Sequence, residues 1–287
     1  MEPADNKKMK VETLLETYGV SDQRTDAWHM KRGEMLTASD IYKALPDATP
    51  SQRHELIMSK LIPRIPTEGA GPRALVWGTR FEPVAKEIYM KENEGVQIVD
   101  TTCVKHPSVS FLGASPDGIL ITEDHTDPQY GKLVEFKCPI SRVFNDSTPI
   151  PVPYYHQMQL QMECTEMEQC EYIEMKFLDL SYSEWVNKTA VYKGWFAVYE
   201  DEITVKYHSL NDSRDLPTWK REEGVNTDAW TMVYWALDMK RTAHVLHQSD
   251  WLEKNLSSIQ SVWDEVVKHR EAGTVPDHPK EKTILTL

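Results

Sequence analysis

The spacing of hydrophobic residues follows a helical period in the first third of the chain. Residues 73–95 show it most clearly, with an apolar stripe at i, i+4, i+7, i+8 and i+11. The members of that stripe are Trp77, Phe81, Val84, Ala85 and Ile88. The same spacing predicts helices over 10–20, 36–45 and 49–62. Thr37 or Ser39 is the expected N-cap of the helix over 36–45.

After Gly95 the pattern changes to short β-rich stretches separated by turn residues. Strands are predicted within 95–107, 111–122, 132–140, 170–180 and 190–210, with a helix over 152–167. Helices are predicted from about 227 to 270, followed by a tail from 274 to 287. This order indicates an α/β fold, a mixed central sheet flanked by helices, with N-terminal helices and a C-terminal helical extension.

Charge and cysteine content narrow the function classes. The chain has 287 residues and a formal charge of −13, which argues against nucleic-acid binding by a bulk positive field. Residues 91–190 carry 16 Asp/Glu against 7 Lys/Arg, which suits divalent cations or a solvated acidic surface.

The four cysteines form no CxxC pair, so reduced thiols are expected. No apolar run reaches the length of a membrane helix, and the charged N-terminus does not resemble a signal peptide, so an intracellular protein is expected.

Two short motifs carry candidate chemistry. Pro116-Asp117-Gly118 has the composition of a turn but lies between strand-like flanks. In the stretch 133–138, strand alternation places Glu135 and Lys137 on one face and apolar residues on the other. Taken alone, such a pair is most simply a solvated ion pair. An antiparallel pairing with the strand after Asp117, however, would bring opposed residues within about 5 Å.

Two carboxylates beside a lysine form a set suited to phosphodiester hydrolysis. Mg²⁺, with Mn²⁺ as a substitute, takes one or two carboxylates together with waters and substrate phosphates. Asp117 and Glu135 would hold one or two such ions, with the Phe136 carbonyl as a further oxygen ligand. Lys137 would orient the attacking water or accept its proton.

The arrangement of Pro-Asp followed by Glu-x-Lys matches the signature of the PD-(D/E)xK nucleases, and the order of elements resembles their restriction-endonuclease-like core. Five blocks then resemble, in order, the phage lambda exonuclease and YqaJ-type viral recombinase family. These blocks are 26–40, 73–89, 113–120, 133–141 and 154–162. The resemblance covers roughly residues 20–178. We therefore divide the chain into an N-terminal segment (1–20), a nuclease core (21–210) and a C-terminal extension (211–287) packed on it as one domain.

The resemblance implies a metal-dependent 5′-3′ exonuclease that resects one strand of linear duplex DNA ends, in viral recombination, repair or genome processing. It assigns catalysis to Asp117, Glu135 and Lys137, and places Glu82 near the metals and Gln157 on the next helix. The residues it assigns to the 5′-phosphate are Arg32 and Ser39. It also implies double-stranded DNA ends as substrate, a single-strand annealing protein as partner and a homo-oligomer, a trimer in the family. The expected location is intracellular: a viral protein in the host cell, or a cytoplasmic or nuclear one.

Several alternatives stay open at this point. Glu82 could be a surface glutamate, and Ser39 an N-cap that also meets phosphate. The same core could belong to a structure-specific or restriction-like endonuclease, or to a catalytically idle DNA-binding scaffold of recombination. The segment 121–132 between the two motifs and the C-terminal hundred residues exceed what the family pattern requires. The tip of the inserted segment could reach DNA or a partner, whereas no role follows for the C-terminal residues from the sequence.

Overall fold

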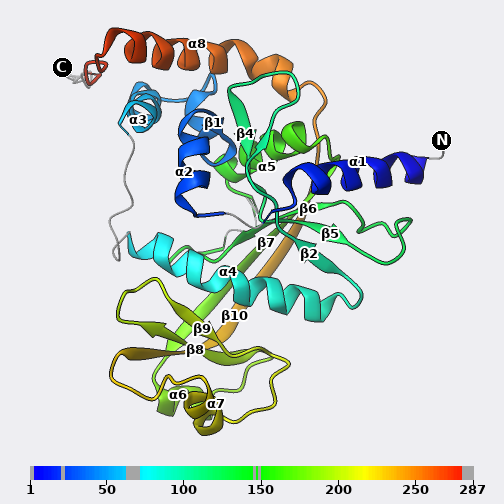
Figure 1. The fold of residues 1–287 in the computed structure, drawn as a ribbon, viewed down its shortest axis with the longest axis vertical. Helices are drawn as coiled ribbons and strands as arrows, with labels where there is room; N and C mark the ends of the chain where they lie inside the picture. Colours follow the sequence, from blue (N-terminus) through cyan, green and yellow to red (C-terminus); the bar gives the residue numbers. More distant parts are fainter. Residues whose placement is uncertain (1–2, 21–22, 63–71, 145–146, 148–149, 280–287) are drawn as a thin grey trace.

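The computed structural model describes residues 3–20, 23–62, 72–144, 147 and 150–279. Its helices are α1 (Pro3–Tyr18), α2 (Asp26–Gly33), the 3-10 helix η1 (Ala38–Ala44), α3 (Pro50–Leu61), α4 (Arg73–Glu92), α5 (Val152–Thr165), α6 (Tyr182–Asn187), α7 (Leu216–Glu222) and α8 (Trp251–Ala272). Its strands are β1 (Leu36–Thr37), β2 (Gln97–Val99), β3 (Val104–Lys105), β4 (Leu112–Ala114), β5 (Gly118–Ile121), β6 (Leu133–Lys137), β7 (Gln169–Leu180), β8 (Lys193–Tyr199), β9 (Val205–Tyr207) and β10 (Trp230–Leu246). Figure 1 shows α1, α2, α3 and α8 in the upper part of the molecule and β8, β9, α6 and α7 at its lower end.

The strands form two sheets. The larger has the order β2-β5-β6-β7-β10-β8-β9, and the smaller has the order β1-β4-β3. Neighbours in the larger sheet are antiparallel except β6 and β7, which are parallel. Parallel neighbours need a crossover, and α5 supplies it here. This mixed sheet flanked by helices confirms the predicted α/β, restriction-endonuclease-like architecture.

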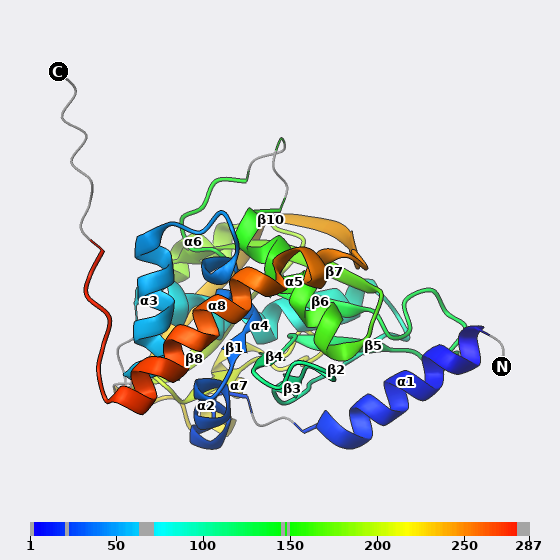
Figure 2. The ribbon, with the colours of Figure 1, turned by 90° about the horizontal axis from the view of Figure 1, so that it is seen from above.

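Two apolar clusters lie on opposite faces of β6. Val134 and Phe136 pack with α4 residues such as Phe81, whereas Leu133 packs with α5 residues such as Met158. The predicted apolar stripe of 73–95 is thus the buried face of α4. Because side chains alternate along a strand, Glu135 and Lys137 share the α5 side with Leu133. Figure 2 shows α8 lying across the same side of the molecule as α3, where their apolar residues join the α5 cluster.

The C-terminal part differs from the prediction. Residues 230–246 form a strand, β10, not a helix, and it lies between β7 and β8 in the middle of the larger sheet. The helical prediction was wrong here because helix-forming residues around 236–241 outweighed the aromatic and β-branched residues before them. A bulge between Leu237 and Met239 also breaks the strand alternation. The sheet therefore continues past the expected boundary at residue 210, and only α8 forms the predicted helical end. The final part of the expected tail, 280–287, lies outside the described residues.

The stretch 111–122 contains two strands in different sheets, which corrects the single predicted strand. β4 belongs to the smaller sheet and β5 to the larger, so Ser115–Asp117 connect them. Gly118 does not have the positive φ that its turn-like context suggested. Its importance is close packing, because a Cβ at this position would lie 2.3 Å from the Ile98 Cγ2. The chain here crosses between sheets and does not form a hairpin tip.

Candidate active site

The pairing of β5 with β6 brings the two predicted motifs together. Gly118 pairs with Val134 in an antiparallel register, which places Asp117 opposite Glu135. Asp117 Oδ2 accepts a hydrogen bond from the Phe136 backbone N–H at 2.7 Å. This bond fixes the Asp117 carboxyl at the side of the Glu-x-Lys strand. The predicted juxtaposition of Asp117 and Glu135 is therefore confirmed.

Glu135 is fully buried, and three side chains satisfy its carboxylate. Its Oε1 accepts from Lys137 Nζ at 2.5 Å and from Gln157 Nε2 at 2.7 Å. Its Oε2 accepts from Gln161 Nε2 at 2.7 Å. An isolated buried carboxylate would be costly, and these donors offset that cost. Gln157 thus joins the site as predicted, and Gln161, one helical turn later on α5, was not among the expected site residues.

Burial and neighbouring charge set the protonation of this cluster. Burial raises the pKa of Asp117 well above its ordinary value, and the nearby Glu135 and Glu82 carboxylates raise it further. Burial alone would lower the pKa of Lys137, but the Glu135 and Asp117 carboxylates more than compensate and raise it. Lys137 is therefore an ammonium here, and its Nζ also lies 4.6 Å from the centre of the Tyr154 ring. Added positive charge beside Asp117 would favour its ionised form.

Glu82 reaches the same site from α4, on the opposite side from α5. Its Oε2 lies 2.5 Å from an Arg24 guanidinium nitrogen, and its Oε1 lies 3.0 Å from Lys86 Nζ. Burial alone would raise the pKa of Glu82, but Lys86 and Arg24 lower it. Glu82 is therefore an ionised, paired carboxylate and not a freely solvated one. Its role as a metal ligand stays a prediction.

Arg32 forms the second part of the site, at the end of α2. Its guanidinium lies 4.3 Å from the Trp28 ring centre and donates hydrogen bonds to Ser39 Oγ at 2.9 Å, Thr37 Oγ1 at 3.2 Å and Ser115 Oγ at 3.4 Å. Among the described residues, no carboxylate lies within ion-pair distance of it. Burial lowers the pKa of Arg32, although the group stays charged. A guanidinium surrounded by hydroxyl groups, with no carboxylate, is suited to bind an external anion.

The structure also refines the roles of the hydroxyl groups. Ser39 is not an N-cap, because it lies inside η1, and Thr37, at the N-cap position, makes no capping bond. Ser39 instead faces Arg32, as the family resemblance implied. Ser115, two residues before Asp117, was missed by the sequence analysis. Its hydroxyl accepts a hydrogen bond from Trp28 Nε1 at 3.2 Å as well as the one from Arg32. Ser115 therefore links the Arg32 group to the connection that carries Asp117.

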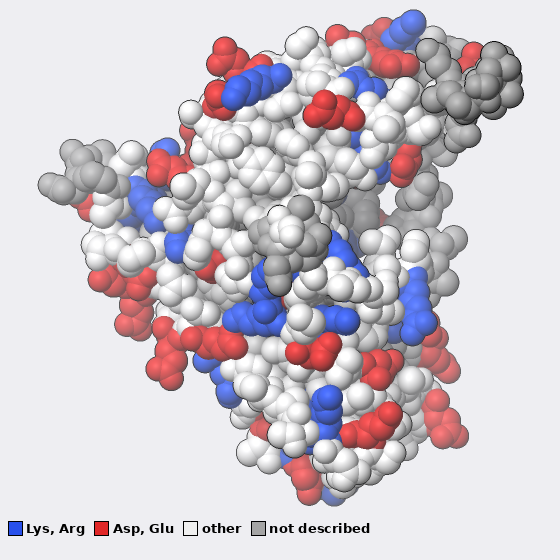
Figure 3. All heavy atoms as spheres, turned by 180° about the vertical axis from the view of Figure 1, so that it is seen from behind, with Lys and Arg blue, Asp and Glu red and all other residues white. Residues whose placement is uncertain are grey.

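All predicted site residues line one open cavity of about 610 Å³. They are Arg32, Ser39, Glu82, Asp117, Glu135, Phe136, Lys137 and Gln157. Arg24, Trp28, Ser115 and Arg142 also line it. The cavity has an acidic cluster at one part of its wall and the Arg32 group at another. Figure 3 views the molecule from behind and shows both charge signs interspersed, with Lys and Arg gathered across the middle of that face.

The donor set fits a hard divalent cation. Carboxylate oxygens of Asp117 and Glu135 are the ligand type that Mg²⁺ prefers, and buried carboxylates gain from a nearby cation. Among the residues described, no three His, Cys, Asp or Glu side chains are grouped closely enough to hold a metal ion together. In this arrangement a cation would rest on one or two carboxylates and on water or phosphate oxygens, and Glu82 would join as a ligand only after release from its ion pair with Arg24. All four cysteines are buried free thiols, as expected. In the described part of the chain, no helix is long and apolar enough to cross a membrane.

The fold is shared with solved alkaline exonuclease structures. An alkaline exonuclease from Laribacter hongkongensis aligns with a TM-score of 0.52 at 19% identity, covering 86% of this chain and 95% of its own. A second structure, of LHK-Exo in complex with dAMP, aligns with a TM-score of 0.51 over the same shares and at the same identity. A phage-related exonuclease from Haemophilus somnus aligns with a TM-score of 0.44 at 13% identity, covering 82% and 96%. The first two alignments show that this chain has the fold of the Laribacter hongkongensis structures.

The sequence also matches a known domain. Residues 27–168 match the YqaJ-like viral recombinase domain. An uncharacterized protein of Acanthamoeba polyphaga mimivirus is 26% identical over 172 residues, which are 57% of this chain and 30% of that protein. The chain therefore spans less than a third of the length of this relative. The matched region contains every predicted site residue.

Proposed function

We propose that the protein is a divalent-metal-dependent exonuclease that resects one strand of linear duplex DNA from its 5′ end. One observation carries the proposal: the Asp117–Glu135–Lys137 cluster and the Arg32 group line the same cavity. The first group suits phosphodiester hydrolysis, and the second suits a phosphate at a strand end. The match of residues 27–168 to a viral recombinase domain supports a role in recombination, repair or genome processing.

In the proposed complex, Arg32 binds the 5′-terminal phosphate. The guanidinium fork matches two phosphate oxygens, and the Ser39 and Ser115 hydroxyls can turn to donate to the others. Trp28 holds the guanidinium plane from one side, which limits the conformational entropy lost on binding. The next phosphate along the strand then lies toward the acidic cluster. Terminal binding of this kind selects the bond one nucleotide from the end.

At the scissile phosphate, each residue of the cluster has a separate role. A Mg²⁺ ion held by Asp117 and Glu135, with Glu82 and the Phe136 carbonyl as further predicted ligands, would stabilise the negative charge that develops on the phosphate. The Phe136 N–H fixes Asp117, and Gln157 and Gln161 fix Glu135. Lys137, as an ammonium, donates to the attacking water or to a phosphate oxygen. Water adds to phosphorus while the 3′ oxygen of the terminal nucleotide leaves with a proton.

A direct test uses linear and closed circular duplexes of one sequence. With Mg²⁺ or Mn²⁺ the protein should release mononucleotides from the linear duplex only, and EDTA should abolish the release. Equal cutting of closed circles would favour a structure-specific or restriction-like endonuclease. A wild-type protein that binds DNA without cutting it in either metal would favour the catalytically idle scaffold. A single-strand annealing partner and a trimeric ring stay predictions from the family resemblance.

A further inference from the structure

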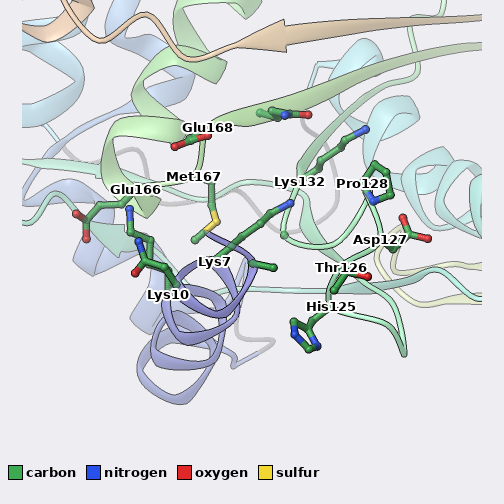
Figure 4. Close-up of a pocket in the computed structure, with 14 residues that line it drawn as sticks. Lys7, Lys10, His125, Thr126, Asp127, Pro128, Lys132, Glu166, Met167 and Glu168 are labelled. Atoms are coloured by element: carbon green, nitrogen blue, oxygen red, sulfur yellow. The ribbon is translucent and has the colours of Figure 1, made fainter. Parts of the chain in front are cut away.

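A second cavity lies apart from the candidate active site, at the opposite end of β6. It has a volume of about 450 Å³ and is enclosed by α1, the segment 125–132 and the turn between α5 and β7. Figure 4 shows residues from all three elements around it. None of its lining residues is shared with the active-site cavity. The sequence suggested no role for α1, and only that the tip of the segment 121–132 could reach DNA or a partner.

Three lysines face this cavity without an ion-pair partner. Lys7 and Lys10 lie one helical turn apart on α1, and Lys132 directly precedes β6. Among the described residues, no carboxylate lies within 4.0 Å of their ammonium groups. Burial lowers the pKa of Lys7, and the charge of Lys132 lowers it further, which indicates close like charges. In Figure 4 the Lys7 side chain extends from α1 toward Lys132.

The neighbouring lysine outside the cavity behaves differently. Lys8, next to Lys7 on α1, does not line the cavity and pairs with Glu12 at 3.7 Å. The unpaired lysines are thus those that line the cavity. Several like charges close together repel one another unless water screens them or an anion compensates them. This distribution indicates a place for an external anion.

The placement of Lys7 is built into the fold. Gly131 has a φ of +73°, and a Cβ there would lie 2.9 Å from Val11 Cγ2 and 3.0 Å from Lys7 Cε. The alkyl chain of Lys7 therefore packs directly on the Gly131 backbone. Val11 is fully buried in the α5-side cluster and anchors α1 at this point. These contacts hold the Lys7 ammonium at the cavity wall.

Three carboxylates also line the cavity, but they do not neutralise the lysines. Asp127 Oδ1 accepts the Gln129 backbone N–H at 2.7 Å, so this carboxylate stabilises the turn before β6. Glu168 and Asp127 raise the pKa of Lys7, yet their effect is smaller than that of burial and of Lys132. Glu166 lies in Figure 4 on the opposite side of the cavity from Lys132. The part of the cavity between Lys7 and Lys132 is therefore the positive part.

We propose that this cavity binds a phosphate group through Lys7, Lys10 and Lys132, and that the phosphate belongs to the backbone of the bound DNA. The assignment of DNA as the source rests on the proposed function. The extended chain from Lys132 through β6 to Lys137 is about 17 Å long at the usual rise of a strand. Phosphates of one strand of B-DNA rise about 3.4 Å apart along the axis. The cavity would thus contact DNA roughly five phosphates from the scissile bond.

The test compares the double variant Lys7→Gln/Lys132→Gln with the single variant Lys8→Gln. Lys8 lies on the same helix but outside the cavity, so its loss controls for the loss of positive charge on α1. Binding of a 5′-phosphorylated duplex is measured by fluorescence anisotropy in EDTA over a range of salt concentrations. Each lost phosphate contact should reduce the slope of log K against log salt by about 1. Because the cavity binds one phosphate, we expect a reduction of about 1 in the double variant and little change in Lys8→Gln.

Calorimetry with inorganic phosphate distinguishes a phosphate of the DNA backbone from free phosphate as the ligand of this cavity. If the double variant loses the calorimetric signal for phosphate but binds DNA as the wild type does, the cavity binds free phosphate or a product and not the DNA backbone. If wild-type DNA binding is intact and both variants match wild type for DNA and for phosphate, the inference is overturned and the proposed function stands. If wild-type protein binds phosphate but no DNA, the site stands and the proposed function fails.

Discussion

The Arg24 guanidinium lies 2.5 Å from the Glu82 carboxylate, and both side chains line the cavity that contains the candidate metal site. Lys86 pairs with the other oxygen and is held in turn by Asp100 at 3.0 Å. The Arg24 side chain is 47% exposed, whereas that of Lys86 is 17% exposed. Arg24 can therefore leave Glu82 with less loss of packing than Lys86.

This relationship predicts that Arg24 competes with a divalent cation. Arg24→Gln should strengthen binding of Ca²⁺ or Mn²⁺, measured by calorimetry without DNA. An ion pair of this exposure contributes about 0.2–1 kcal/mol, which corresponds to an increase of roughly 1.5-fold to fivefold in affinity. Lys31→Gln is the matched control, because Lys31 lies over the Tyr18 ring and does not line the cavity. Equal effects of the two variants would show that only net charge matters.

The Arg32 group predicts a preference for phosphorylated ends. Arg32→Ala should reduce kcat/KM on 5′-phosphorylated duplex and leave the rate on 5′-hydroxyl duplex nearly unchanged. Charged hydrogen bonds contribute about 1.5–3 kcal/mol, so the ratio of the two rates should fall roughly tenfold to a hundredfold. Arg32→Lys keeps the charge but loses the planar fork, and should give an intermediate ratio. A ratio that does not depend on residue 32 would remove the terminal-phosphate role.

From the position of Lys137 we predict that its loss slows DNA cleavage without weakening DNA binding. Lys137→Ala should lower the rate of strand loss by at least about 10²-fold, since it removes a positioned donor at the scissile phosphate. Affinity for DNA in EDTA should change little, because the Arg32 group is intact. Lys176→Ala, which removes a β7 lysine 4.0 Å from Asp238, provides a control for general loss of charge. Unchanged cleavage by Lys137→Ala would contradict the assignment of the cluster.

Two glycines should respond to alanine in opposite directions. Gly118→Ala would place a Cβ 2.3 Å from Ile98 Cγ2, and overpacking of this kind lowers the free energy of unfolding by about 1–3 kcal/mol. At Gly78, inside α4, a Cβ meets no atom within 4 Å, so Gly78→Ala should raise stability by about 0.5–1 kcal/mol. Urea denaturation of both variants measures the difference. Equal stabilities would mean that the chain near Asp117 is not packed as described.

Glu163 predicts a specific pH dependence of stability. Burial would raise its pKa, but hydrogen bonds from His106 and His247 lower it below the ordinary value. A carboxyl whose pKa is lower in the folded state stabilises the protein above the unfolded pKa, about 4.3, and loses this contribution as the pH falls through the folded pKa. Glu163→Gln should therefore lower the free energy of unfolding at pH 6 by about 1 kcal/mol and have a smaller effect near pH 3. A difference that does not vary with pH would exclude this linkage.

The chemistry of the site was predictable because its main residues lie in short local motifs. Alternation along 133–138 is enough to separate Glu135 and Lys137 from the core, and one antiparallel pairing places Asp117 beside them. The α4 helix was predictable from its apolar stripe. Arg32 and Ser39 followed from the family pattern and not from periodicity, since helix α2 buries no residue.

Other features depend on contacts between distant parts of the chain. Arg24 and Glu82 are 58 residues apart, and Ser115 meets Arg32 across 83 residues, so no local pattern indicates either pair. β10 forms a strand because β7 and β8 pair with it on both sides, and that pairing outweighs the helical preference of its middle part. Helical spacing does place Gln161 on the same face of α5 as Gln157, four residues earlier, but only the structure shows that both amides donate to Glu135.

Strand polarity tests the central claim most directly. A linear duplex with a 5′-phosphate on the labelled strand only, carrying one fluorophore at an internal 5′-proximal position and another near the 3′ end of the same strand, is incubated with wild-type protein and Mg²⁺. The account predicts early release of the 5′-proximal label as mononucleotide, later release of the 3′ label, and neither release in EDTA or with Asp117→Asn. Early release of the 3′ label, or release of both labels in EDTA, would contradict it.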